Sequence, residues 1–325
     1  MTQNTWTIAV LDPITPQTAE RLRGLLPPGM RLTHGTARDE AHLQSVIADA
    51  DYAVSGQIAV PGTVLRAATR LKLLHKWGVG VDNFDLDAAR ELGITVARTT
   101  GSNAVPVAEF TLGLMISSLR NLAQGHAELS EGRWGAGNFA RPTMMLSGKT
   151  VGVVGFGAIG KMVARLLSGF GCTILYHKPN PLGLEEDAAL GVRYASLPEL
   201  LAECDVVSLH CPLTPGTRGL INRAALQAMK RTAVLVNVAR GGVVVEDDLV
   251  WALQNRVIHA AAMDVFETEP LPADSPLLRL DGLTVTPHIA AIAADNFERT
   301  VRQMFGNIER MSRGAAIPDR DIVVA

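Results

Sequence analysis

The sequence has few cysteines, little net charge and no long apolar run. Its three cysteines, Cys172, Cys204 and Cys211, fall in no CxxC or Cys/His spacing, which predicts reduced thiols in a cytoplasmic protein and no bound metal. A net charge of −2 without a clustered basic run gives no reason to expect nucleic acid or an anionic membrane as a partner. The first apolar run is short and has no basic residue before it, unlike a signal peptide, and no run reaches the length of a membrane span.

What the sequence has instead is length and regular alternation. With 325 residues, 47% of them hydrophobic, the chain is long enough for two domains with substantial cores. Short β-rich runs alternate with helical patterns, which predicts parallel sheets with helices on both faces. The expected strands lie at residues 5–12, 30–35, 52–56, 71–77, 94–99, 150–155, 172–177, 206–211, 233–239, 259–265 and 283–287. A long helical stretch begins near Asn103, and a last helix covers about 295–312.

A glycine-rich turn follows the first strand of the second series. It reads Gly155-Phe-Gly157-Ala-Ile-Gly160 and opens a helical pattern. In this context the first glycine permits a tight turn, the second lets a pyrophosphate approach the backbone, and the third lets helix and strand pack closely. The free N–H groups of the helix N-terminus favour phosphate. A dinucleotide is therefore expected here; the alternative is a turn without a ligand.

Polar residues follow three later strands at even spacing. Arg240, Asp264 and His288 are each 24 residues apart, about one βα unit, so all three can emerge at one edge of a parallel sheet. Glu269 lies on the loop just after Asp264. Taken singly, each has an ordinary structural reading: a surface arginine, a structural histidine, a solvated loop acid. Their occurrence together with the glycine turn indicates a catalytic site.

That set has the parts of a hydride-transfer site for a keto acid. An arginine can hold a carboxylate through two parallel hydrogen bonds and polarise the adjacent carbonyl. A histidine can give or take the hydroxyl proton, and a neighbouring carboxylate favours its protonated form. We therefore expect Arg240, Glu269 and His288 to be the catalytic residues.

The sequence resembles the D-isomer-specific 2-hydroxyacid dehydrogenase family over nearly its whole length. The resemblance is carried, in the family's order, by "KWGVGVDNFDLDAARELGITV", "VAEFTLGLM", "GKTVGVVGFGAIG", "HCPLTPGT", "LVNVARGGVVVEDDLVWAL", "MDVFETEP" and "VTPHIA". It implies an α/β protein of two doubly wound parallel-sheet domains with the active site in the cleft between them. A flavodoxin-like substrate domain, residues 1–102 plus 290–325, would carry an inserted Rossmann NAD(P)-binding domain, residues 103–289.

The resemblance also implies roles for individual residues. Arg240 would bind the substrate carboxylate and carbonyl, His288 would be the acid/base paired with Glu269, and the backbone at Val79 and Gly80 would meet the substrate carboxylate. Asp264 would meet the nicotinamide carboxamide, although it could instead be a strand-end cap, and Gly78 and Gly80 could form only a turn. The implied cofactor-binding residues are Gly155, Gly157, Ala158, Ile159, Gly160, His177, Lys178, Val238, Ala239, Arg240 and Asp264.

The substrate stays open among glyoxylate, hydroxypyruvate and other small 2-keto acids. Glu269 argues against the formate dehydrogenases of this superfamily, which carry glutamine there, and Val79 argues against phosphite dehydrogenase-like members, which carry lysine. Lys76 could reach a second anionic group on the substrate or be a solvated lysine.

Two other kinds of protein remain as alternatives. Some relatives are nucleotide-sensing corepressors, and an L-amino-acid dehydrogenase would leave "NVARGG" and "TPHIA" unexplained.

The long helix from Asn103 and its following loop resemble the family's dimerisation segment, which implies a homodimer.

One residue shifts the expected cofactor. Lys178 lies 23 residues beyond Gly155, where NAD-dependent relatives carry an acid that accepts hydrogen bonds from the adenosine ribose. Lysine has no acceptor but attracts a 2′-phosphate, by roughly 1 kcal/mol at an exposed site. The sequence thus favours NADP(H) over NAD(H); the alternative is that Lys178 points to solvent and the site tolerates either.

Overall fold

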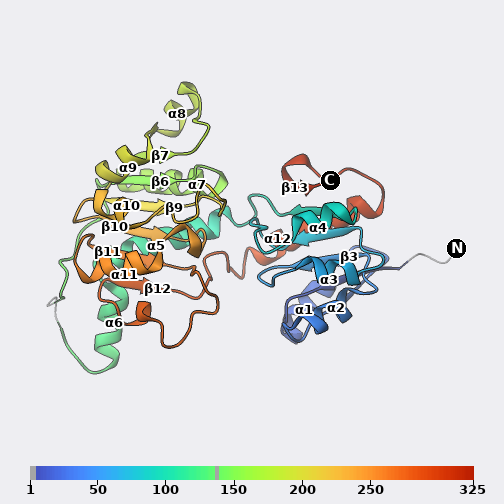
Figure 1. Cartoon of the computed structure of the whole chain (residues 1–325). Coiled ribbons are helices and arrows are strands. Elements are labelled where there is room, and N and C mark those ends of the chain that lie inside the picture. Colours follow the sequence, from blue (N-terminus) through green and yellow to red (C-terminus); the bar gives the residue numbers. More distant parts are fainter. Residues whose placement is uncertain (1–4, 136–138) are drawn as a thin grey trace. The chain divides into compact units, whose positions relative to one another are not determined.

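The computed structural model describes residues 5–135 and 139–325 (Figure 1). Contacts divide the chain into two compact units: unit 1 contains the residues up to Asn103 together with Ala293–Ala325, and unit 2 contains Ala104–Ile292. Among the described residues, no helix is both long enough and apolar enough to cross a membrane.

Unit 1 is built on a six-stranded sheet in the order β13-β5-β4-β3-β1-β2. Its first five strands pair in parallel, and β13 runs antiparallel to β5. The order of those five, 2-1-3-4-5, is that of flavodoxin-like folds, as predicted. Their bounds are β1 (Trp6–Val10), β2 (Met30–His34), β3 (Tyr52–Ser55), β4 (Leu73–Lys76), β5 (Thr95–Arg98) and β13 (Ile322–Val324).

Helices cover both faces of this sheet. α1 starts at Pro16, where the missing N–H costs nothing, and Thr15 caps it by accepting a hydrogen bond from Thr18 N. Side chains of α1 and α12 pack on one face, and those of α2, α3 and α4 pack on the other. The bounds are α1 (Pro16–Arg23), α2 (Glu40–Ile47), α3 (Gly62–Ala67), α4 (Leu86–Glu91) and α12 (Phe297–Ser312).

Unit 2 contains a seven-stranded, all-parallel sheet in the order β12-β11-β10-β9-β6-β7-β8. Counted within the unit, β6 is first, so the order contains the 3-2-1-4-5-6 arrangement of Rossmann folds. The order reverses between β6 and β9, which makes their carboxyl ends the switch point. The bounds are β6 (Thr150–Val154), β7 (Thr173–His177), β8 (Val192–Tyr194), β9 (Val206–Leu209), β10 (Val234–Asn237), β11 (Ala260–Met263) and β12 (Leu283–Val285).

The helices of unit 2 form a layer on each face of the sheet. α5 and α7 bury side chains on one face, and α9, α10 and α11 bury side chains on the other. The bounds are α5 (Ala104–Arg120), α6 (Leu122–Ser130), α7 (Ala158–Leu167), α8 (Leu184–Leu190), α9 (Leu197–Glu203), α10 (Arg223–Ala228) and α11 (Glu246–Gln254). Single 3-10 turns lie at Ser168–Phe170, Gly241–Val243, Pro276–Arg279 and, in unit 1, Asp319–Asp321.

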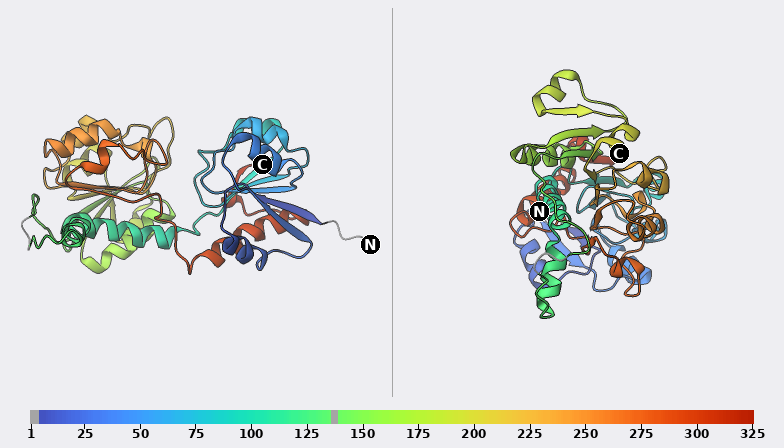
Figure 2. Two further views of the ribbon diagram at one scale, coloured as in Figure 1. Left: turned by 90° about the horizontal axis from the view of Figure 1, so that it is seen from below. Right: turned by 90° about the vertical axis from the view of Figure 1, so that its left-hand side faces the viewer.

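One segment of unit 2 extends away from the sheet. The long helix expected from Asn103 is two helices, α5 and α6, because Asn121 between them has the left-handed φ of 53°. α6 has no buried residue and projects from the body of the unit (Figure 2). The loop that follows, residues 132–142, has no helix or strand where it is described, and residues 136–138 lie outside the described part of the chain.

Two strands were not predicted from the sequence. β8 and β13 have only three residues each. Both are edge strands, paired on one side only, so their sequences lack the long apolar run that marks the central strands.

Candidate active site

The glycine turn lies at the switch point of unit 2, and its glycines meet three different surroundings. Gly155 has φ 92°, and a Cβ there would stand 2.4 Å from Cys211 N on the strand-end segment after β9. A Cβ on Gly160 would stand 2.4 Å from the carbonyl oxygen of Gly155, so this glycine lets α7 pack against β6. A Cβ on Gly157 would meet nothing within 4 Å.

These surroundings fit the pyrophosphate of a dinucleotide. Gly157 is the N-cap of α7, and among the described residues no side chain caps that helix. The N–H groups of its first turn, at Ala158 and Ile159, are therefore left without a capping side chain at the positive end of the helix dipole. An anion can approach the backbone at Gly157 without meeting a side chain.

The segment after β7 carries the residue that the sequence associates with NADP. Lys178 is half-buried, and within the described ranges it makes no hydrogen bond or ion pair. Its neighbour His177 is held in place, with Nδ1 3.1 Å from the carbonyl oxygen of Ala195. Tyr176, fully buried and stacked 4.4 Å from the Phe156 ring, accepts a hydrogen bond from Leu182 N, which shapes the loop that carries Lys178.

Arg240 follows β10 on a turn that a buried side chain braces. Asn237 donates from Nδ2 to Arg240 O at 2.9 Å and accepts from Ala239 N at 3.0 Å. Val238 and Ala239 are buried at 9% and 8% exposure, so they form a covered wall beside the arginine. Asn237 was not singled out from the sequence, although an asparagine at the end of an apolar strand is a signal for such a brace.

Glu269 and His288 form a close pair. His288 Nδ1 lies 2.7 Å from Glu269 Oε2, and Phe266 N donates to Glu269 Oε1 at 3.0 Å. Burial alone would raise the pKa of Glu269, but these two hydrogen bonds and the charges of His288 and Arg240 lower it below its usual value. Arg240 also contributes to the lowering of this pKa through its charge.

Asp264 holds the loop on which His288 sits. Its fully buried carboxylate accepts from Thr286 Oγ1 at 2.6 Å, Ile289 N at 2.9 Å and Ala290 N at 2.9 Å, and its carbonyl oxygen accepts from His288 N at 2.8 Å. His288 has φ 54°, a conformation that non-glycine residues adopt only when their surroundings impose it. Asp264 is thus a strand-end cap in this structure, and its contact with a nicotinamide remains a prediction.

Gly241 lets the loop that carries Arg240 lie against the loop that carries Glu269. A Cβ on Gly241 would stand 1.9 Å from Phe266 C and 2.3 Å from Glu267 N, so only glycine lets the loop after Arg240 lie against the loop before Glu269. Glu246 Oε1 accepts from Glu267 N at 2.7 Å, and Glu267 Oε1 accepts in return from Glu246 N at 3.3 Å.

The remaining predicted substrate residues, Val79 and Gly80, belong to unit 1. They lie on the half-buried loop after β4. Gly78, with φ 141°, is tied to the carboxyl end of β5, since its carbonyl oxygen accepts from Thr99 N at 2.9 Å and from Thr99 Oγ1 at 3.0 Å. The loop therefore has a fixed base.

Another residue at the switch point was not singled out from the sequence. His210, just after β9, lies against Gly155, and its Nε2 is 2.8 Å from Ser208 Oγ. Removal from water lowers the pKa of His210 to about 3, so its ring is neutral.

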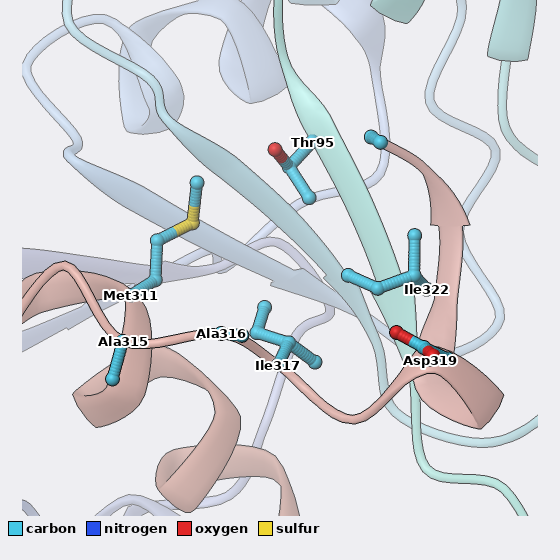
Figure 3. Close-up of a pocket in the computed structure, with 8 residues that line it drawn as sticks. Thr95, Met311, Ala315, Ala316, Ile317, Asp319 and Ile322 are labelled. Carbon is cyan, nitrogen blue, oxygen red and sulfur yellow. The ribbon is translucent and has the colours of Figure 1, made fainter.

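Two further features lie apart from these residues. Within the described parts of the chain, no group of three or more His, Cys, Asp or Glu side chains is placed to hold a metal. A mostly apolar pocket of unit 1 (Figure 3) lies at the amino end of β5, at the edge opposite the substrate loop. It is lined by Thr95, Met311, Ala315, Ala316, Ile317, Asp319, Ile322 and Ala325.

Comparison with protein families supports the interpretation of unit 2 as a dinucleotide-binding domain. Residues 112–290 match the family described as D-isomer specific 2-hydroxyacid dehydrogenase, NAD binding domain. The chain is 38% identical over 281 residues to D-3-phosphoglycerate dehydrogenase of Methanocaldococcus jannaschii, covering 86% of this chain and 53% of that one. It is 36% identical over 298 residues to glyoxylate reductase of Korarchaeum cryptofilum, covering 90% and 86%. The chain spans little more than half the length of the phosphoglycerate dehydrogenases it matches.

Solved structures share the folds of both units. The TT0316 protein from Thermus thermophilus matches with a TM-score of 0.85 and 35% identity, covering 98% of this chain and 100% of that one. NAD-dependent formate dehydrogenase from Staphylococcus aureus in complex with NAD matches with a TM-score of 0.86 and 30% identity, covering 98% and 99%.

Proposed function

The chain belongs to the D-isomer-specific 2-hydroxyacid dehydrogenase family, and on that premise we propose that it is an oxidoreductase that transfers a hydride between NAD(P)H and a small 2-keto acid. Glyoxylate and hydroxypyruvate are the type of substrate proposed, with the D-2-hydroxy acid as the reduced form. The observation that carries this proposal is the 2.7 Å contact between Glu269 and His288, with Arg240 close enough to affect the carboxylate.

Each catalytic residue has one task in this proposal. Arg240 binds the substrate carboxylate and polarises the neighbouring carbonyl. His288, held through Nδ1 by Glu269, delivers a proton from Nε2 to the carbonyl oxygen, and Glu269 stabilises the imidazolium that precedes this transfer. The backbone at Val79 and Gly80 also binds the substrate carboxylate.

The chain's own residues also hold the cofactor. Gly157 and the first turn of α7 bind the pyrophosphate, and Val238 and Ala239 line the nicotinamide pocket. A bound reduced cofactor would supply a hydride to the carbonyl carbon. With the proton from His288, the keto acid gains two electrons and two hydrogens, and His288 recovers its proton from solvent.

Formate oxidation is the second candidate that the relatives suggest, and the site argues against it. Oxidation of formate releases no hydroxyl proton, so it has no use for a carboxylate–imidazole pair. Glu269 lies 34% exposed beside a histidine that is 31% exposed, which gives the pair access to solvent protons. Hydroxy-acid chemistry uses such a pair in both directions.

We propose NADP(H) as the preferred cofactor. Lys178 stands where an acid would bind the ribose of NAD, and it is half-exposed. Its positive charge attracts a 2′-phosphate. The acidic first turn of α8, Glu185 to Asp187, limits this preference, although Lys161 pairs with Glu186 at 2.5 Å and neutralises one of those charges.

We also propose a homodimer formed through the segment that projects from unit 2. Leu122 and Leu129 on α6, and Trp134 and Met145 beyond it, are between 54% and 82% exposed, and an interface between two copies would cover such side chains. Sedimentation of wild type and Leu129→Asp tests this: a monomeric wild type would contradict it. A cytoplasmic location accords with the three free cysteines, and no nucleic acid or membrane partner is proposed.

One experiment tests the proposed activity. Purified protein is offered glyoxylate, hydroxypyruvate, pyruvate and phenylpyruvate, each with NADH and with NADPH. The proposal expects oxidation of reduced cofactor with at least one small keto acid. Cofactor binding without turnover of any keto acid would favour the binding-only, corepressor-like alternative.

A further inference from the structure

Lys76 ends β4 at the edge where the substrate loop begins, and it is only 7% exposed. The sequence offered two readings of this residue, a ligand for a second anionic group and a solvated lysine. Its burial contradicts the second. Its partners bear on the first, since Nζ donates to the carbonyl oxygen of Gly56 and, at 2.7 Å, to Asn83 Oδ1.

The partners of Lys76 lie in a loop that a carboxylate holds from the other side. Asp12 accepts hydrogen bonds from three successive backbone N–H groups after β3: Gly56 N at 2.5 Å, Gln57 N at 2.9 Å and Ile58 N at 3.3 Å. Three N–H groups converging on one carboxylate fix the local backbone strongly.

One peptide group feels both charges. In the peptide between Gly56 and Gln57, the carbonyl accepts from the ammonium of Lys76 and the N–H donates to the carboxylate of Asp12. The positive charge lies at the negative end of the peptide dipole and the negative charge at its positive end. Both hydrogen bonds are charge-assisted and each polarises the peptide in favour of the other.

Asn83 ties the same loop to the segment after Gly80. Its Nδ2 donates to Ile58 O at 2.6 Å, while its Oδ1 accepts from Lys76. Ser55 closes the loop by donating to Ile58 O at 2.9 Å. Lys76 therefore sits between the Gly56–Ile58 loop and the loop that holds Val79 and Gly80.

We propose that Lys76 is a positioning residue that fixes the Gly56–Ile58 loop beside the substrate loop, and that it is not a receptor for a second anionic group on the substrate. The inference rests on the proposed function for its consequence in substrate selection. A covered ammonium whose hydrogen bonds go to Gly56 and Asn83 cannot reach a further anion without releasing the loop. Loss of Lys76 then weakens the binding of singly and doubly charged keto acids alike.

The test combines amide hydrogen exchange with steady-state kinetics on the intact protein. In Lys76→Met, the Gln57 and Ile58 amides are expected to exchange roughly tenfold faster or more, because the loop loses an anchoring donor. The kcat/KM values for pyruvate and for oxaloacetate, which carries a second carboxylate, are expected to fall by the same factor within about twofold. Unchanged exchange at Gln57 and Ile58, or a loss confined to oxaloacetate, would overturn the proposal.

Two more variants sharpen the result. Lys76→Gln keeps an N–H donor without the charge, so a smaller acceleration of exchange is expected, and it serves if Lys76→Met does not fold. Arg98, the strand-register partner of Lys76 on β5, is the matched control because it removes a cation from the same edge. Arg98→Met should leave exchange at Gln57 and Ile58 unchanged. If the wild type reduces no keto acid, the proposed function fails while the exchange measurement still decides the role of Lys76.

Discussion

Glu269 Oε2 accepts a hydrogen bond from His288 Nδ1 at 2.7 Å, and its other oxygen accepts one from Phe266 N. The carboxylate thus fixes the ring while the loop fixes the carboxylate. In Glu269→Gln the amide can still contact the ring, but it cannot stabilise an imidazolium. We expect kcat for keto-acid reduction to fall by roughly tenfold or more, measured at saturating keto acid. An unchanged kcat would contradict the role given to Glu269.

The lowered pKa of Glu269 makes a separate prediction about stability. Because the folded pKa lies below the ordinary value of 4.5, the ionised carboxylate stabilises the folded state above that pH. This contribution is lost as the pH falls through the folded pKa. Glu269→Gln should therefore lower the free energy of unfolding at neutral pH, by less than about 1 kcal/mol because the pair is partly exposed. Melting curves across pH should show the difference vanishing in acid; a difference that grows there would be inconsistent.

Asp264→Asn tests how His288 is held. An asparagine can place only one acceptor oxygen, so either Ile289 N or Ala290 N would face an NH2 group in a buried site. We expect the free energy of unfolding to fall by roughly 1–3 kcal/mol, with a loss of kcat because His288 moves. Thr286→Val, which removes one donor and keeps the shape, should cost less in urea denaturation. Equal stability of Asp264→Asn and wild type would contradict the proposal that the Asp264 carboxylate holds the loop of His288.

Gly241→Ala and Gly157→Ala form a matched pair. A methyl group at Gly241 would overlap the Phe266–Glu267 backbone, whereas at Gly157 it would enter open space. Gly241→Ala should lower the free energy of unfolding by roughly 2 kcal/mol or more. Gly157→Ala should keep its stability and raise KM for the cofactor. The opposite pattern, a stable Gly241→Ala and an unstable Gly157→Ala, would contradict the close packing described at Gly241 and the open space described at Gly157.

Lys178→Asp tests the cofactor preference. Removing an attraction and adding a repulsion should lower the NADPH/NADH ratio of kcat/KM by roughly tenfold or more. Lys149→Asp makes the same charge change next to the amino end of β6, at the opposite edge of the sheet from the glycine turn, and should leave the ratio unchanged. The preference for NADP(H) would be wrong if Lys178→Asp also left it unchanged.

The sequence was informative wherever local pattern and strand spacing decide the outcome. The glycine turn at 155–160 and the polar residues at 240, 264 and 288 follow strands whose ends must meet at one sheet edge. Parallel sheets with helices on both faces were predicted from the alternation of strand and helix patterns, and the two doubly wound domains were predicted from the family resemblance. Glu269 was found because it lies five residues beyond Asp264 on the same loop.

What the sequence could not show depends on contacts between distant segments. Nothing near Lys76 indicates that Gly56 and Asn83 would take up its hydrogen bonds. The hydrogen bonds that Thr286, Ile289 and Ala290 donate to the Asp264 carboxylate likewise form only once β11 and β12 lie side by side. β8 and β13 are too short to carry a period of their own.

The most direct test of the central claim compares wild type with His288→Ala in the reduction of glyoxylate and hydroxypyruvate by NADPH and NADH. His126→Ala, on the exposed α6, serves as the control for removal of a histidine. The account predicts that kcat falls by roughly a hundredfold or more in His288→Ala and is unchanged in His126→Ala, while cofactor binding is kept. Equal keto-acid reduction by wild type and His288→Ala would contradict the account.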